Sequence, residues 1–281
     1  MAAEAQAAAA AESKLDILGH IQDHGYLDVP FLNAHHVIDG RLDLPQFPPF
    51  QVSGITVDLS ITRHVVMMWV AGLLITGLLL RAFRRPQPVP RGLANLFEAM
   101  AVFVRDDIVY AVMGERGKPY LPYLLTVFFF ILTCNLLGLI PYSASATGNI
   151  SVTAALAGCT FVTFLGAGIA NNGLFGYFKS LVPHGVPAWL LPIMVPLELF
   201  GIFTRPFALC IRLFANMMAG HVVILALLGM IFLFGTIYVA PGSVLFVAAI
   251  YLLEIFVALV QAFIFTLLSA LFINMAAHPE H

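Results

Sequence analysis

The stretch LFGIFTRPFALCIRLFANMMAGHVV, from Leu199 to Val223, decides how the chain is interpreted. Nearly all of it could dissolve in lipid, yet it contains Arg205 and Arg212, and Glu198 comes directly before it. On a helix these three charged residues are seven positions apart and follow one stripe within about 20° per step. A guanidinium keeps its charge, which costs at least about 2.5–3.5 kcal/mol near the middle of a bilayer. Arg212 is therefore a candidate functional residue, and the alternative is a structural ion pair with Glu198.

The composition is typical of an integral membrane protein. Of the 281 residues, 60% are hydrophobic and only 10% are charged, whereas about a quarter are charged in a typical soluble domain. Residues 1–58 hold eight acidic and two basic side chains. We predict a polar N-terminal extension over residues 1–58 and a membrane domain over residues 59–281. The histidines at 20, 24, 35 and 36 are interpreted as part of a solvated tail rather than as a metal site.

The fold expected for the membrane domain is all-α, with five transmembrane helices. Apolar runs long enough to cross a hydrocarbon core of about 30 Å occupy residues 61–83, 119–140, 150–170, 189–239 and 242–275. Residues 92–113 show helical apolar spacing but carry too much charge to span, so we interpret them as an amphipathic helix on the inner membrane surface. Asn135, Asn171 and Asn172 are attributed, with the small residues around them, to close helix packing.

The last two apolar runs are much longer than the roughly 20 residues that a span requires. Pro192, Pro196 and Pro206 provide bend points in the first of these runs. A break without charged residues, around positions 240–242, separates the two. We therefore predict a long hairpin of steeply tilted antiparallel helices.

Basic residues determine the predicted orientation. The first span ends in RAFRRPQPVPRG, with arginines at 81, 84, 85 and 91, and such residues are enriched in cytoplasmic loops. This end is therefore placed inside, and the N-terminal extension lies outside. Five crossings then bring the C-terminus inside. Arg205 lies nearer the inner interface than Arg212, and we expect its side chain to extend to the lipid headgroups.

The predicted hairpin carries two further titratable residues. His221 follows Arg212 by nine residues, and in the returning helix Glu254 precedes Gln261 by seven. If Arg212 and Gln261 have similar depth, the histidine and the glutamate meet on the outer side of them. Nine residues place His221 about 180° around the helix from Arg212. One helix face therefore presents the arginine, and the other lines a polar route between the helices.

These residue types favour proton transfer. A histidine and a glutamate in a buried, watery pocket can exchange protons near neutral pH. A permanently charged arginine beyond them repels protons and blocks a continuous path, while it attracts a carboxylate on a neighbouring protein. The order of charges indicates two half-paths that are separated by a cation. A movable carboxylate on a second protein would carry the proton between them.

Two segments of the hairpin, PFALCIRLFANMMAGHVVI (Pro206 to Ile224) and QAFIFTLLSALFI (Gln261 to Ile273), resemble the signature segments of subunit a of F-type ATP synthases. NLLGLIP (Asn135 to Pro141) and PLELFGIFTRP (Pro196 to Pro206) match as well. The resemblance covers about residues 60–275. It is specific, since RLFxNMxAG followed by a distant QAxIFTLL is not a generic hydrophobic pattern.

The resemblance implies that six residues serve proton translocation, namely Arg212, Asn216, His221, Glu254, Gln261 and Glu198. Arg212 would be the stator arginine that faces the ring of c subunits. Asn216 would be the polar residue one turn further on, and Gln261 would be the glutamine opposite the arginine.

The remaining three residues would serve the two ends of the proton route. His221 and Glu254 would belong to the outer half-channel, with the histidine on the first helix and the glutamate on the second, as in mitochondria and their bacterial relatives. Glu198 would be the acid on the inner side.

The function implied by the resemblance is that of a non-catalytic stator subunit in the membrane sector of a rotary ATP synthase. It would provide two offset aqueous half-channels that pass protons to and from the c-ring carboxylates and so couple proton flow to rotation. The implied partners are the c ring, peripheral-stalk b-type subunits and the lipid bilayer, and no cofactor, metal or nucleic acid is expected. A bacterial inner membrane is expected in preference to the mitochondrial inner membrane.

Two other classes of membrane protein fit the sequence less well. A secondary transporter that used the same residues would have an internal repeat, and residues 61–180 do not resemble residues 189–275. An intramembrane hydrolase would need a nucleophile–base pair or an HExxH metal motif, and neither occurs in the sequence.

Overall fold

The computed structural model describes residues 26–28, 41–46, 50–52, 55–57, 60–84, 91–140, 143, 145–180, 190–234 and 240–277. In the described residues before α3 (Arg63–Phe83) there are four strands of three residues each. β1 (Tyr26–Asp28) pairs with β2 (Arg41–Asp43), and β3 (Phe50–Val52) pairs with β4 (Ile55–Val57), both antiparallel. The histidines at 20, 24, 35 and 36 lie outside the described residues.

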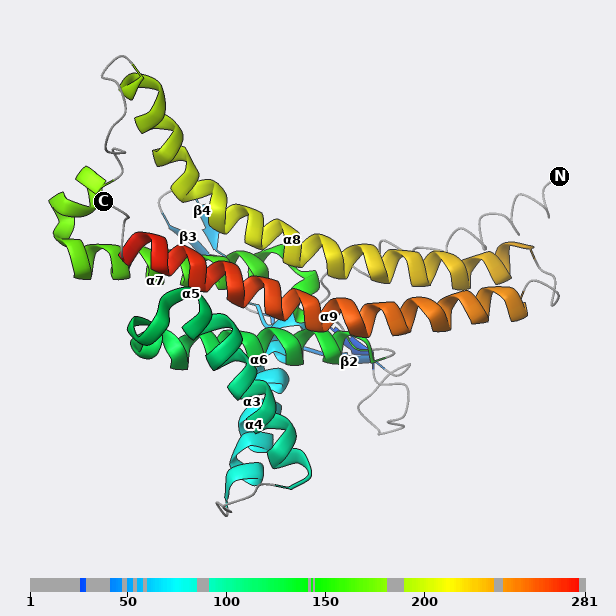
Figure 1. The fold of residues 1–281 in the computed structure, drawn as a ribbon. Coiled ribbons are helices and arrows are strands. Elements are labelled where there is room, and N and C mark those ends of the chain that lie inside the picture. The colour runs from blue at the N-terminus through cyan, green and yellow to red at the C-terminus, as the bar shows by residue number, and fades with distance from the viewer. Residues whose placement is uncertain are drawn as a thin grey trace. The chain divides into compact units, whose positions relative to one another are not determined.

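Helices make up most of the described residues from Arg63 onward (Figure 1), in the order α3 (Arg63–Phe83), α4 (Leu93–Phe103), a π-helical segment (Val104–Tyr110), α5 (Ala111–Met113), a 3₁₀ segment (Gly114–Tyr120), α6 (Leu121–Gly138), a 3₁₀ turn (Ala146–Gly148), α7 (Ile150–Ser180), α8 (Leu191–Phe234) and α9 (Ala240–Ala277). Within the described part of the chain, five helices are long and apolar enough to cross a membrane. The predicted all-α fold with five transmembrane helices is confirmed. Helices suit this setting because a bilayer offers no partners for backbone N–H and C=O groups.

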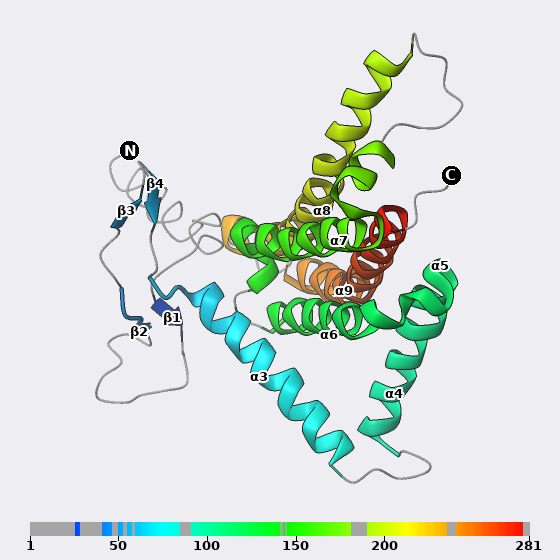
Figure 2. The same cartoon turned by 90° about the vertical axis from the view of Figure 1, so that its left-hand side faces the viewer.

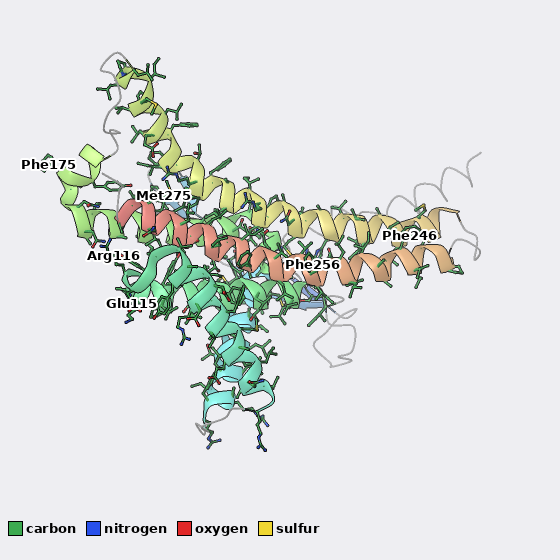
Figure 3. All side chains as sticks on the ribbon, viewed as in Figure 1. Glu115, Arg116, Phe175, Phe246, Phe256 and Met275 are labelled. Carbon is green, nitrogen blue, oxygen red and sulfur yellow. The ribbon has the colours of Figure 1, made fainter. Side chains whose placement is uncertain are left out.

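The outer surfaces of these helices are apolar. Phe175, Phe246 and Phe256 are large exposed side chains and point away from the ribbon (Figure 3). Exposed apolar surface on this scale marks contact with membrane or protein. The chain is therefore a multi-pass membrane protein, in agreement with its composition.

The chain forms two compact units. The first unit comprises the chain up to Ala71 together with residues 134–149 and 215–258, and the second comprises residues 72–133, 150–214 and 259–281. α8 and α9 contribute to both units and run next to one another in Figure 1.

The second unit contains the main hydrophobic core. Its largest fully buried side chains come from the π-helical segment and from α6, α7, α8 and α9. They include Ile108, Leu124, Ile131, Phe164, Leu209, Leu213, Phe265 and Ile273. Figure 2 shows α6, α7 and α9 next to one another. Because all of these elements contribute large side chains to it, this core fixes the parts of α8 and α9 that belong to the second unit.

The charged segment at residues 92–113 is helical but is not a single regular helix. The later part of its apolar stripe lies in the core of the second unit, where Val104 and Ile108 are fully buried, whereas Leu93 and Leu96 at its start are exposed. The Phe103 ring lies 5.7 Å from the Phe263 ring. The amide of Asn274 donates to the carbonyl of Val112 at 3.1 Å. The helical spacing thus reflects packing against protein. A position on the inner membrane surface stays a prediction.

The third membrane helix is longer than the run of residues 150–170 that the sequence indicates. α7 continues to Ser180 through a kink at Gly173, whose φ of 71° and ψ of 164° suit glycine. The amide of Asn172 donates to the carbonyls of Ala276 and Ala277 at 3.1 and 3.4 Å. Asn172 therefore provides partners for carbonyls that are left open at the end of α9, which goes beyond close packing.

α8 and α9 have the lengths that the hairpin interpretation requires. They contain 44 and 38 residues, about twice what a perpendicular span needs. Pro196 and Pro206 lie inside α8, where each removes a backbone hydrogen bond and favours bending. The steep tilt of the hairpin in a bilayer stays a prediction.

Candidate functional site

Arg212 lies on α8 in the second unit and is exposed. Its neighbours Leu209 and Leu213 are buried in the core, so the helix turns its apolar face inward and the arginine outward. No hydrogen bond or ion pair engages Arg212 within the described ranges. A cation that is exposed on an apolar helix and not neutralised by its own chain can attract an external carboxylate.

Glu198 pairs with Arg205 rather than with Arg212. Nη2 of Arg205 donates to Oε1 of Glu198 at 2.8 Å, and both side chains are partly buried. The Arg205 guanidinium also lies over the ring of Phe272 on α9, 5.8 Å from its centroid. The expectation that Arg205 extends to the headgroups is therefore wrong, because a carboxylate and an aromatic ring hold it inside the second unit.

Gln261 is buried on α9 in the same unit as Arg212. Its relative exposure is 2%, and the next residue, Ala262, belongs to the hydrophobic core that also contains Leu209 and Leu213. The segments that bear Gln261 and Arg212 therefore contribute to the same hydrophobic core. The second unit thus contains Glu198, Arg212 and Gln261 of the six predicted residues.

His221 lies on α8 in the first unit, with both ring nitrogens close to backbone carbonyls. Nδ1 is 3.0 Å from the carbonyl oxygen of Met217, and Nε2 is 3.1 Å from that of Gly138 at the end of α6. A neutral imidazole has one N–H and can donate to only one of these oxygens at a time, whereas an imidazolium donates to both. The His221 ring therefore connects α8 to the end of α6.

Glu254 lies on α9 in the first unit, directly against the backbone of α8. A Cβ built on Gly220 would clash with Oε1 of Glu254 and would lie 2.7 Å from its Cδ. Oε2 is buried and has no hydrogen-bond partner within the described residues. A buried carboxylate oxygen without a partner is costly in a structural residue, so Glu254 is available for a proton or a water molecule.

The first unit brings three of the predicted residues onto the facing segments of α8 and α9. His221 directly follows Gly220, the residue that Glu254 contacts. Asn216 lies five residues earlier on α8 and is exposed. The geometry therefore gathers the titratable pair of the predicted outer route around one glycine, which allows the two helices to approach closely.

A buried hydrogen-bond chain in the first unit was not predicted. Nδ1 of His64 on α3 donates to the carbonyl of Ser145 at 2.9 Å. Thr147 donates to Oδ1 of Asn135 at 2.7 Å, so its hydroxyl accepts from Ser145 at 2.9 Å. All four residues are at most 4% exposed. The chain fixes the segment after α6 close to Gly138, whose carbonyl contacts His221.

One signal in the sequence could have revealed this chain. The segment after the second predicted span, PYSASATGN, is rich in hydroxyl side chains and has no charge. Hydroxyls at a helix end compete for local hydrogen bonds with neighbouring backbone and side chains. Asn135 is 12 positions from its partner Thr147, and His64 is 81 positions from its partner Ser145. These contacts therefore follow no local periodicity.

Replacing Thr147 with valine should destabilise the protein by about 1–3 kcal/mol, because it leaves the buried Asn135 Oδ1 and the Ser145 hydroxyl without their partner. Thermal unfolding of the purified protein would show the loss as a lower midpoint. Thr126→Val is the matched control, since Thr126 is exposed and its hydroxyl donates to the carbonyl of Pro122 in its own helix. Equal midpoints for the two variants would contradict a stabilising role for the chain.

Comparisons with known proteins agree with the geometry. The family model described as ATP synthase A chain matches residues 65–274. A curated protein named ATP synthase subunit a from Chloroherpeton thalassium is 49% identical over 260 residues, which cover 88% of this chain and 77% of that protein. ATP synthase subunit a from Myxococcus xanthus is 55% identical over 228 residues, which cover 80% of this chain and 75% of that protein. ATP synthase subunit a 2 from Chlorobium luteolum is 47% identical over 273 residues, which cover 94% of this chain and 76% of that protein.

Proposed function

The chain belongs to the family of ATP synthase A chains, and from this membership we propose that it is the stator subunit of a rotary F-type ATP synthase, passing protons to and from the c ring. It is then a part of the membrane sector of that complex. The half-channels, the contact with the c ring and the absence of catalysis in this subunit are parts of the proposal. ATP itself is made elsewhere in the complex.

The observation that best supports the proposal is the state of Arg212. It is exposed on an apolar helix and has no partner within the described part of its own chain. A permanent charge in that setting is costly unless a partner outside the chain uses it. A carboxylate at mid-membrane on a rotating c subunit is such a partner, because it can meet the arginine when ionised and move past lipid when protonated.

The proposed entry route lies on the outer side. Protons pass His221, Asn216, Gln261 and Glu254 to reach a c-subunit carboxylate. Two observations support this route: the Glu254 carboxylate lies against Gly220, the residue before His221, and its Oε2 has no hydrogen-bond partner among the described residues. Rotation then carries the proton nearly full circle, Arg212 prevents a direct leak, and the proton leaves inward past the region of Glu198.

The partners and the location follow from the same proposal. The c ring faces Arg212, and b-type subunits of the peripheral stalk hold the chain in place. The complex lies in a bacterial inner membrane, with the N-terminus outside and the C-terminus in the cytoplasm. Arginines at the end of α3 support this orientation through the preference of basic residues for the cytoplasmic side.

Glu254→Gln should slow proton flux by about tenfold without abolishing it. Flux slows because a glutamine cannot exchange a proton, and it persists because His221 and water remain in the route. ATP-driven proton uptake into inverted membrane vesicles measures the effect. Glu115→Gln is the matched control, since Glu115 is exposed and forms only a surface ion pair with Lys118 (Figure 3). An unchanged rate in Glu254→Gln would remove this residue from the proposed route.

Purification of the tagged chain from its native membrane tests the function as a whole. The chain should co-purify with a short two-helix protein that has a carboxylate near mid-membrane, and the isolated complex should pump protons when it hydrolyses ATP. The chain alone in liposomes should transport no solute. Autonomous transport by the purified chain would favour a secondary transporter instead.

A further inference from the structure

Two arginines on one stripe of α8 are held in opposite ways. Arg205 is partly buried and bonded to Glu198 at 2.8 Å, whereas Arg212, seven residues later, is exposed and has no partner in the described chain. Seven residues correspond to about 10 Å along the helix axis. Both side chains belong to the second unit. The protein therefore neutralises one cation of the stripe and leaves the other free.

An un-neutralised charge at position 205 would change the electrostatic field around Arg212. At a separation of about 10 Å and an effective dielectric constant of about 20, one unit charge changes the equilibrium of another by about tenfold. A carboxylate moving along this stripe would then encounter two attractive cations in place of one. A stator that must release and capture the carboxylate at a single position needs the charge of the second cation to be neutralised.

We infer that Glu198 is the counter-ion of Arg205, which leaves Arg212 as the single effective cation on the stripe that the neighbouring carboxylate meets. The inference rests on the proposed function, and it gives Glu198 a role other than that of a proton carrier. Glu198 and Arg205 are then positioning residues, because they act on the carboxylate through the field around Arg212.

The residues around the Glu198–Arg205 ion pair favour its formation. The ring of Phe272 lies 5.8 Å from the Arg205 guanidinium carbon and provides a cation–π contact from α9. Gly201 lies one turn before Arg205, and a Cβ added there would contact its Nη2 at 3.9 Å. With the ring, the carboxylate and the open space at Gly201, the arginine folds back along α8 toward Glu198 rather than toward Arg212.

Three variants separate a counter-ion from a proton carrier: Glu198→Gln, Arg205→Gln and the double variant that carries both changes. Proton pumping per ATP hydrolysed is measured in inverted vesicles and divided by the amount of assembled complex on a native gel. Glu198→Gln should lower this ratio by about tenfold, since it exposes a cation that cannot lose its charge. Arg205→Gln should have a smaller effect, because a carboxyl group can become neutral by binding a proton.

The double variant gives the decisive comparison. With neither charge present, Arg212 is again alone, so coupling should return to within about threefold of the unmodified protein. A double variant as slow as Glu198→Gln would show that the carboxyl group of Glu198 is itself needed, and would overturn the inference. Normal coupling in Glu198→Gln would overturn it as well.

Assembly and the proposed function are controlled separately. If Glu198→Gln does not assemble, because an unpaired buried charge destabilises the protein, the double variant alone still tests the inference, which requires it to pump. Arg205→Lys, which keeps the charge, should retain coupling. A failure of the double variant while Arg212 variants lose synthesis refutes only the counter-ion role, whereas normal synthesis without Arg212 refutes the proposed function.

Discussion

Replacing Arg212 with alanine should abolish ATP synthesis driven by a proton gradient and raise passive proton leak through the membrane sector. The reason is that Arg212 is exposed on α8 and has no partner among the described residues, and in the proposed mechanism it is the charge that repels protons between the two half-paths. A carboxylate of the c ring also loses the charge that displaces its proton. Synthesis in membrane vesicles, and decay of an imposed pH gradient with the catalytic part removed, measure the two effects.

Arg116→Ala is the matched control for this variant. Arg116 is also an exposed arginine of the second unit (Figure 3), but it lies in the charged 3₁₀ segment between α5 and α6. Synthesis and leak should be unchanged there. Normal synthesis in Arg212→Ala, in membranes that contain the usual amount of assembled complex, would refute the stator role.

Replacing Gly220 with alanine should lower proton flux at least as much as Glu254→Gln does. The added Cβ would occupy the space of the Glu254 carboxylate, 2.7 Å from its Cδ. Either the carboxylate moves away from His221 or α8 and α9 separate, and overpacking of this kind costs about 1–3 kcal/mol. ATP-driven proton uptake per assembled complex distinguishes the loss of the route from the loss of the protein.

Gly158→Ala on α7 controls for the substitution itself. No atom lies within 4 Å of a Cβ added at that position, and alanine favours a helix over glycine by about 1 kcal/mol. Proton uptake should therefore be normal and the protein slightly more stable. Uptake that is equal in the Gly220 and Gly158 variants would show that the closeness of Glu254 to α8 is not required.

The helices could be predicted because the bilayer imposes simple rules. A span needs about 20 apolar residues and must satisfy its own backbone, so composition alone located five helices and the long final pair. The segment at residues 92–113 shows the limit of such patterns. Its periodicity was sufficient to predict a helix with one apolar face, but periodicity does not say whether lipid or Phe263 of a distant helix covers that face.

The sequence predicted that Glu198, Arg205 and Arg212 follow one another at helical spacing, but it left their pairing open and was wrong about the surroundings of Arg205. Fourteen helical residues separate Glu198 from Arg212 by about 21 Å, farther than the two side chains can reach, while Arg205 is seven residues away. Helix geometry alone could therefore have excluded the Glu198–Arg212 pair. That Arg205 turns inward depends on Phe272, which lies 67 positions later and whose proximity no local pattern reveals.

The hydrogen-bond chain from His64 to Asn135 was beyond sequence reasoning for a similar reason. His64 meets Ser145 across 81 positions, and a single histidine near the start of a helix gives no signal of such a partner. The contact between His221 and Gly138, across 83 positions, is of the same kind. Residue types identified the titratable groups, whereas the backbone groups that orient them came only from the fold.

The tie between Asn172 and the end of α9 has a mechanical consequence. Terminal turns of a helix unravel easily, because their carbonyls lack partners, yet the last carbonyls of α9 accept hydrogen bonds from α7. In the proposed stator, α9 would experience lateral force as the ring turns. Hydrogen bonds between α7 and the end of α9 would then help the helix that bears Gln261 to keep its last turn.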